Sequence, residues 1–133
     1  MQTKQTLLAW LRSARLLQFV DHSRMAREVL RMWPSRRAFA ARHPESPLPS
    51  IALSYDAFGS IDAEALYDQG KVHAGFIAER IRRHHEAPAI ICDWGCGPMR
   101  VLQHMPGLLP RSRFIGLDYN PRTIDWCERK WPA

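Results

Sequence analysis

Four residues near the end of the chain have types and a spacing that could hold a nucleoside. Asp93 ends a short apolar segment, and Gly95 and Gly97 follow it at alternate positions. Asp118 ends a second apolar segment 25 positions after Asp93. Glycine lets the backbone come close to a ligand because it has no Cβ. A carboxylate that ends a strand can accept hydrogen bonds from ribose hydroxyls. The pattern therefore predicts a pocket for a nucleotide-like ligand.

The first of these acids also indicates the charge of the ligand. In dinucleotide-binding proteins the pyrophosphate lies at the glycine turn. Asp93 places negative charge at that position, which disfavours a diphosphate and favours a cationic ligand. A dinucleotide-dependent dehydrogenase would also need glycine three positions after Gly97, where this chain has Arg100. The sequence thus favours a positively charged nucleoside over a dinucleotide.

Two parallel strands are needed to bring these residues together. Residues 89–93 and 114–118 are short apolar runs, typical of strands buried on both faces of a parallel sheet. A short helix is expected over 99–105, and Asn120 followed by Pro121 is typical of a helix start. The order strand, glycine turn, helix, strand, acid, helix predicts an α/β fold with a right-handed parallel βαβ unit.

The same segment resembles the class I S-adenosylmethionine-dependent methyltransferases. Residues 93–98 (DWGCGP), followed by Arg-Val-Leu at 100–102, resemble their first motif. Residues 114–121 (FIGLDYNP), with Ile124 and then Trp-Cys, resemble their second. The close resemblance covers about residues 88–133. It implies a Rossmann-like domain and S-adenosylmethionine as cofactor.

The resemblance also implies which residues contact this cofactor. The cofactor carries a sulfonium and an ammonium group, so two nearby carboxylates suit its charge. Asp93 would face the amino group through water, Asp118 would bind the ribose hydroxyls and Tyr119 would lie beside the adenine. The methionine part would be lined by the glycine turn, Gly95, Cys96 and Gly97.

A weaker resemblance extends back to about Tyr55. Related enzymes often have a helix before the first motif that carries a glycine and a basic residue and covers the cofactor, and Gly70-Lys71 matches that pair. Tyr55 and Lys71 are therefore predicted cofactor contacts, although Lys71 is also typical of a solvated charge on a helix. One departure concerns Met99, which stands where the family usually has a third glycine. Its side chain would either crowd the pocket or pack beneath it.

The three cysteines do not match a metal site or a disulfide framework. Cys92 and Cys96 have the first spacing of a radical iron–sulfur motif, but Met99 occupies the position of the third cysteine. Zinc would need four ligands, and Cys92, Cys96 and His104 do not supply that set. Cys92 is expected to be a small core residue.

The first part of the chain carries all of the excess positive charge. Residues 1–50 contain nine lysines and arginines and three acids, whereas the rest contains equal numbers of both signs. Helical periodicity over 4–20 predicts one helix, and a second is expected from Asp21 or Ser23 to Pro34, which stops it. The charge fits a solvated helix face. Alternatively, the chain is a non-catalytic binding module whose basic arm contacts nucleic acid or an acidic protein.

These observations predict four segments. A basic helical arm spans 1–41, a Pro-rich linker spans 42–50, a helical cover segment spans 51–87, and the N-terminal part of an S-adenosylmethionine-binding domain spans 88–133. Within the cover segment, 51–58 is short and mixed. A helix from Ser60 or Asp62 to about His85 follows, in which Gly70 marks a break or a close approach.

The remaining composition excludes further classes. The chain lacks a run of about 18 apolar residues, which excludes a membrane-spanning helix. Its first apolar stretch is too short for a secretory signal, which indicates a cytoplasmic protein.

The methyltransferase sheet normally has seven strands, whereas this sequence predicts only two. We therefore expect the N-terminal part of a methyltransferase with weak or no catalysis, or a short homologue that dimerises through exposed sheet edges. No residue indicates a catalytic base or the methyl acceptor.

Overall fold

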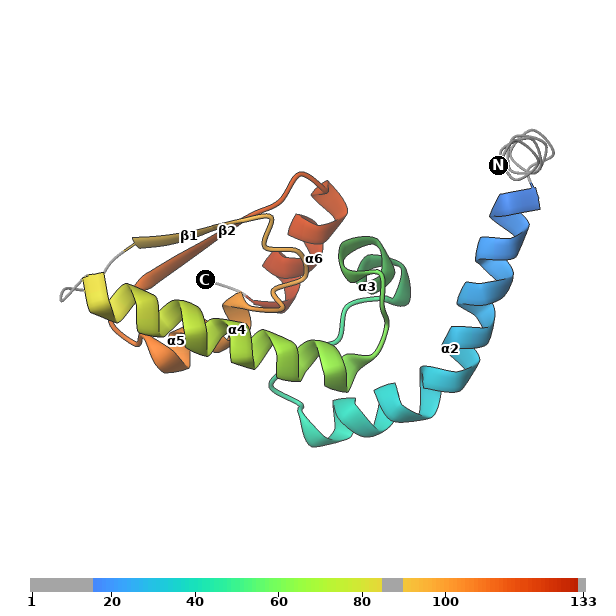
Figure 1. The fold of residues 1–133 in the computed structure, drawn as a ribbon, viewed down its shortest axis with the longest axis horizontal. Helices are drawn as coiled ribbons and strands as arrows, with labels where there is room; N and C mark the ends of the chain where they lie inside the picture. Colours follow the sequence, from blue (N-terminus) through green and yellow to red (C-terminus); the bar gives the residue numbers. More distant parts are fainter. Residues whose placement is uncertain (1–15, 85–89, 132–133) are drawn as a thin grey trace, which may run out of the picture. The chain divides into compact units, whose positions relative to one another are not determined.

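The computed structural model describes residues 16–84 and 90–131. The chain is a mixed helix-and-strand protein with two parallel strands in an open sheet, preceded by helices (Figure 1). It divides into two compact units, Met1–Trp33 and Pro34–Ala133. The elements are α2 (Leu16–Arg42), α3 (Ile51–Phe58), α4 (Ala63–His84), β1 (Ile90–Trp94), the 3₁₀ helix η1 (Leu102–His104), α5 (Met105–Leu108), β2 (Arg113–Leu117) and α6 (Pro121–Lys130).

Strands β1 and β2 pair in parallel, which confirms the central prediction for the fold. The register runs from Ile90 opposite Arg113 to Trp94 opposite Leu117. Each strand lies one residue away from the range predicted for it, 89–93 or 114–118. The parallel pairing brings the carboxyl ends of both strands to the same edge of the sheet. The glycine turn and Asp118 therefore follow neighbouring strand ends.

Only one face of the sheet is covered. Ile91 and Phe114 on the inner face pack against a core of Ala74, Leu102 and Met105, which belong to α4, η1 and α5. On the outer face every residue of both strands is exposed, and Trp94 reaches 87%. The prediction that both faces are buried is therefore wrong, because the described helices pack on the inner face alone. For the same reason Cys92, on the outer face, is exposed and is not a core residue.

Helix α4 begins as predicted and passes through Gly70 without a break. The Asp62 carboxylate accepts a hydrogen bond of 3.1 Å from Ala65 N, which caps the first turn. Gly70 is buried, and a Cβ added to it would overlap the carbonyl oxygen of Arg100 and lie 3.0 Å from the carbonyl carbon. Of the two predicted explanations for this glycine, the close approach is confirmed.

Pro34 does not stop the N-terminal helix, contrary to prediction. Helix α2 continues through it to Arg42, and the second compact unit begins at this proline in the sequence. The residues that follow are anchored in the second unit. Arg36 is buried and donates hydrogen bonds to Ile61 O at 2.8 Å and to Pro49 O at 2.7 Å, and burial lowers the pKa of its guanidinium. The part of the predicted first helix over 4–15 lies outside the described residues.

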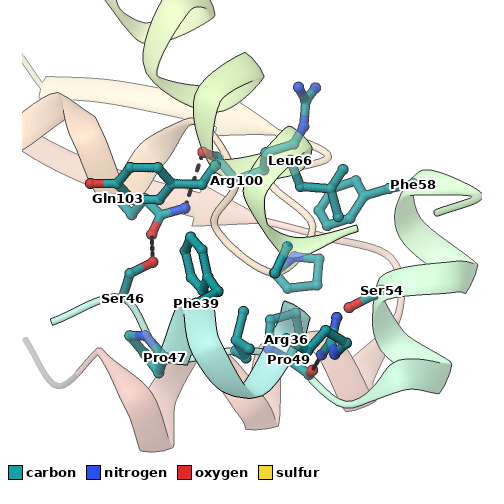
Figure 2. Close-up of a pocket in the computed structure, with 14 residues that line it drawn as sticks. Arg36, Phe39, Ser46, Pro47, Pro49, Ser54, Phe58, Leu66, Arg100 and Gln103 are labelled. Carbon is teal, nitrogen blue, oxygen red and sulfur yellow. Dashed lines mark hydrogen bonds between the residues drawn. The ribbon is translucent and has the colours of Figure 1, made fainter. Parts of the chain in front are cut away.

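Residues 51–58 form helix α3 rather than a mixed segment. Ser50 Oγ accepts a hydrogen bond from Leu53 N, and Gly59 ends the helix in the left-handed conformation at φ 64°. The Pro-rich segment 42–50 before it is packed into the second unit. In Figure 2 its Ser46 donates a 2.6 Å hydrogen bond to Gln103 Oε1, beside a cavity of about 30 Å³. The segment is therefore joined to η1, which contains Gln103.

The connection between the strands is less helical than predicted at its start. Residues 97–101 are turns, and helical structure begins only at Leu102 and continues to Leu108, beyond the predicted range of 99–105. The predicted start of α6 is confirmed. Asn120 Oδ1 accepts a hydrogen bond of 3.0 Å from Arg122 N, with Pro121 at the first helical position.

Candidate functional site

The glycine turn after β1 is anchored to the end of β2. Gly95 N and Cys96 N donate hydrogen bonds of 2.7 and 3.0 Å to Leu117 O. Gly95 and Gly97 adopt positive φ angles of 81° and 52°, a region that favours glycine. Glycine therefore occupies the two positions at which the turn after β1 needs a positive φ angle.

Asp118 connects the two predicted motifs. Its Oδ2 accepts a 2.9 Å hydrogen bond from Gly97 N, and its Oδ1 accepts a 2.8 Å hydrogen bond from Asn120 N. One carboxylate thus holds both the glycine turn and the start of α6. Each of its oxygens can accept a further hydrogen bond, because a carboxylate offers about four lone-pair sites.

A further carboxylate that the sequence analysis missed also lies at this site. Asn120 Nδ2 donates a 2.9 Å hydrogen bond to Asp56 Oδ2 at the end of α3. The two residues are 64 positions apart, so no local spacing could have indicated the contact. The bond ties the cover segment to the rim formed by the two strands.

Two adjoining hollows open at this rim. The first, of about 250 Å³, is lined in part by the carboxylates Asp56 and Asp118. The second, of about 400 Å³, is lined by Trp94, Gly95, Leu117, Asp118 and Tyr119. Gly95, Asp118 and Tyr119 line both hollows, and Tyr119 is 91% exposed. A ligand with a charged polar half and a flat apolar half would match this pair. The other residues of the first hollow are Ala57, Phe58, Gly95, Gly97, Tyr119, Asn120 and Thr123.

The two glycines of the turn serve different purposes. A Cβ added at Gly95 would have no atom within 4 Å, so this glycine leaves the rim open. A Cβ at Gly97 would lie 3.3 Å from the ring of Phe58 and 3.6 Å from the Cβ of Ala57. Gly97 therefore lets α3 approach the turn closely.

Met99 occupies a backbone conformation that glycine would adopt more easily. Its φ is 63°, the only positive value among the described residues other than glycine. This conformation costs a side-chain-bearing residue about 1 kcal/mol. The side chain packs against the core cluster and lines a hollow behind the turn, away from the two hollows at the rim. Of the two predicted alternatives, the structure supports packing beneath the pocket.

Asp93 and Cys96 lie on the inner side of the turn. Asp93 lines neither hollow, and its partial burial raises the pKa of its carboxyl, which the nearby Arg100 guanidinium partly offsets. Cys96 is buried and lies within the electrostatic reach of both Asp93 and Asp118. The two predicted carboxylates therefore flank the turn, but only Asp118 borders the open rim.

Tyr55 and Lys71 lie outside both hollows. Tyr55 is 40% exposed on α3, whereas Asp56, Ala57 and Phe58 of the same helix line the first hollow. Lys71 is exposed on α4, and its charge adds to burial in lowering the pKa of His104. The structure therefore does not bring these two predicted contacts to the rim.

Two thiols behind the turn, the buried Cys96 and the half-buried Cys127, should make the fold sensitive to alkali. Burial, the neighbouring Cys127 and the Asp118 carboxylate raise the pKa of Cys96 to about 12. Burial and Asp118 raise that of Cys127 to about 11. Because both pKa values exceed those of unfolded thiols, this stability is complete below about pH 9 and is lost as pH rises through 11 to 12. Each thiol should cost about 1.4 kcal/mol per pH unit in that window.

Urea unfolding between pH 8 and 11 measures this dependence. We expect Cys127→Ala to flatten it and Cys92→Ala, at an exposed position, to leave it unchanged. A thiol-reactive dye at pH 8 should label the exposed Cys92 readily and the other two cysteines only after unfolding. Equal labelling of all three thiols in the folded chain would contradict this assignment.

Comparisons with protein-family models, curated proteins and solved structures give no match for this chain. Among the described residues, no group of three or more His, Cys, Asp or Glu side chains is arranged to hold a metal ion. No helix in that part of the chain combines the length and apolar composition needed to span a bilayer.

Proposed function

We propose that this chain is the cofactor-binding part of an S-adenosylmethionine-dependent methyltransferase. The observation that carries the proposal is the pair of hollows that share Asp118, one bordered by two carboxylates and one lined by Trp94 and Tyr119. Parallel strands, a glycine turn and a carboxylate at the second strand end accompany it. Nucleosides bind at such rims in open α/β sheets. The free cysteines fit a reducing compartment, so the proposal includes a cytoplasmic location.

The residues at the rim suit the chemistry of the proposed cofactor. Asp56 and Asp118 give the first hollow negative charge, which attracts the ammonium and sulfonium groups. Trp94 and Tyr119 offer ring faces on which an adenine could stack. The free lone pairs of Asp118 could accept the ribose hydroxyls.

When bound, the cofactor supplies an electrophilic methyl group. The residues of this chain would hold and orient it. Both carboxylates at the rim are engaged in hydrogen bonds that position the turn and α6. We therefore assign binding and orientation to them and assign no residue as the base for the methyl acceptor.

Titration calorimetry of the full chain with S-adenosylhomocysteine, the demethylated form of the cofactor, tests this proposal. We expect saturable binding of this ligand and none of NAD, whose pyrophosphate would meet the carboxylates. Tyr119→Ala should weaken binding about tenfold through lost stacking. It should leave the fold intact because this side chain is 91% exposed.

Tyr55→Ala is the matched control, since it removes the same side chain from a position outside both hollows. We expect wild-type affinity from it. A folded chain that binds no S-adenosylhomocysteine, or that binds NAD equally well, would refute the proposed function. Equal losses in both tyrosine variants would refute the placement of the adenine.

A further inference from the structure

A small cavity lies between the end of α2, the Pro-rich segment 42–50, α3, the start of α4 and the loop that follows the glycine turn (Figure 2). Its lining residues all belong to the second compact unit. The volume is about 30 Å³, which has room for one or two water-sized groups and is too small for an organic ligand. The size alone therefore limits a ligand at this place to water or a small ion.

The wall of this cavity contains a buried positive charge. Arg36 is buried, and its side chain donates hydrogen bonds to two neutral acceptors, Ile61 O and Pro49 O. None of the ion pairs between described residues includes Arg36. The two carbonyls satisfy only part of the guanidinium, which has further N–H donors, and they leave its charge uncompensated. A buried charge of this kind is costly unless a counter-ion pairs with it.

A second polar group borders the same cavity. The Ser54 hydroxyl on α3 is fully buried and makes no hydrogen bond with any described residue. In Figure 2 its oxygen points from α3 toward the side of the cavity at which Arg36 lies. Most buried hydroxyls are hydrogen-bonded, and an exception indicates a bound water or ion. Because a hydroxyl can rotate and donate, it suits an anion as well as water.

The rest of the wall adds positive charge and no acid. Arg100 also borders the cavity, with its guanidinium carbon 5.5 Å from the centre of the Phe58 ring. Among the described residues, no Asp or Glu lines this cavity. A cation would therefore be repelled, and a water molecule would leave the charge of Arg36 uncompensated. An anion would meet both a buried guanidinium and a hydroxyl able to donate to it.

We propose that this cavity binds one monatomic anion, with chloride as its occupant. The Arg36 guanidinium and the Ser54 hydroxyl donate charge-assisted hydrogen bonds to the anion. The anion neutralises the buried charge and joins α2 to α3, the helix that carries Asp56 and Phe58 to the first hollow of the candidate site. The inference rests on the cavity alone and is independent of the proposed function.

Thermal unfolding of the full chain in mixtures of sodium chloride and sodium gluconate, at constant ionic strength, tests the proposal. Gluconate is an organic anion too large for the cavity, so it is the reference. We expect the melting temperature to rise with chloride and then level off, because a ligand that binds only the folded state stabilises it by mass action. Exclusion of salt from the protein surface acts without a specific site and does not saturate in this way.

Ser54→Ala should raise the Kd for chloride at least about tenfold, because it removes a hydrogen bond to a charged acceptor. In gluconate alone this variant should unfold at the wild-type temperature or above, since alanine favours the helix and leaves no buried hydroxyl unpaired. Ser60→Ala is the matched control, because Ser60 lies outside the cavity, where its Oγ accepts a hydrogen bond from Asp62 N. It should lower the melting temperature in both salts and keep the chloride dependence.

Crystals of the wild-type chain soaked in bromide would locate the anion directly by anomalous scattering. We expect a peak in the cavity within hydrogen-bond distance of Arg36 and Ser54. Density for water without an anomalous peak there would overturn the proposal, as would peaks confined to surface arginines, which mark an adventitious ion only. A melting temperature that is the same in chloride and gluconate, or that depends equally on chloride in wild type and Ser54→Ala, would also overturn it.

Discussion

Replacing Gly70 by alanine should destabilise the chain by about 3 kcal/mol, the upper range for inserting an atom into a packed interior. The added Cβ would overlap the carbonyl oxygen of Arg100. The position of the Cβ is set by the backbone of α4, and the carbonyl oxygen is itself a backbone atom. Neither can rotate away as a side chain could. Urea unfolding followed by circular dichroism measures the loss as a lower midpoint at an unchanged slope.

Gly75→Ala provides a matched control on the same helix. A Cβ at Gly75 has no atom within 4 Å, and alanine is favoured over glycine in a helix interior by about 0.5–1 kcal/mol. The control should therefore stabilise the chain. If both variants had the same effect on stability, the close approach of α4 to the backbone at Arg100 would be contradicted.

Replacing Asp118 by asparagine should destabilise the chain and weaken ligand binding together. The carboxylate accepts hydrogen bonds from Gly97 N and Asn120 N through separate oxygens. An amide has one acceptor oxygen, so its NH₂ group would face one of the two N–H donors. We expect a loss of about 2–4 kcal/mol in the free energy of unfolding, since these bonds involve a charged acceptor.

The binding effect of this variant is measured by calorimetry under conditions in which it remains folded. We expect the affinity for S-adenosylhomocysteine to fall at least tenfold (about 1.4 kcal/mol). Asp125→Asn, at an exposed position on α6, should change stability by less than about 0.5 kcal/mol and leave binding unchanged. An Asp118→Asn chain with wild-type stability would contradict the hydrogen bonds described for this carboxylate.

Local patterns predicted the elements around the site well. The apolar runs of β1 and β2, the glycines between them and the Asn120-Pro121 helix start each depend on residues within a few positions of one another. Their parallel pairing followed from the order of the elements. Such features can be predicted because the conformational preferences that produce them depend on residues only a few positions apart in the sequence.

The errors occurred where distant contacts outweigh local preference. Proline normally ends a helix, but α2 continues through Pro34, and Arg36, two residues later, binds the carbonyl of Ile61. Asp56 gives no local signal of its place at the rim, because its contact with Asn120 joins positions 64 apart.

The sequence by itself determined the two strands, the turn that must contain glycine and the carboxylate that ends β2. Only the tertiary structure decided how these parts are used. It showed that Gly97 admits the ring of Phe58, that Met99 packs beneath the turn, and that one face of the sheet stays open. The physical reason is that burial and close approach depend on the elements that meet in space, and residue spacing along the chain does not specify them.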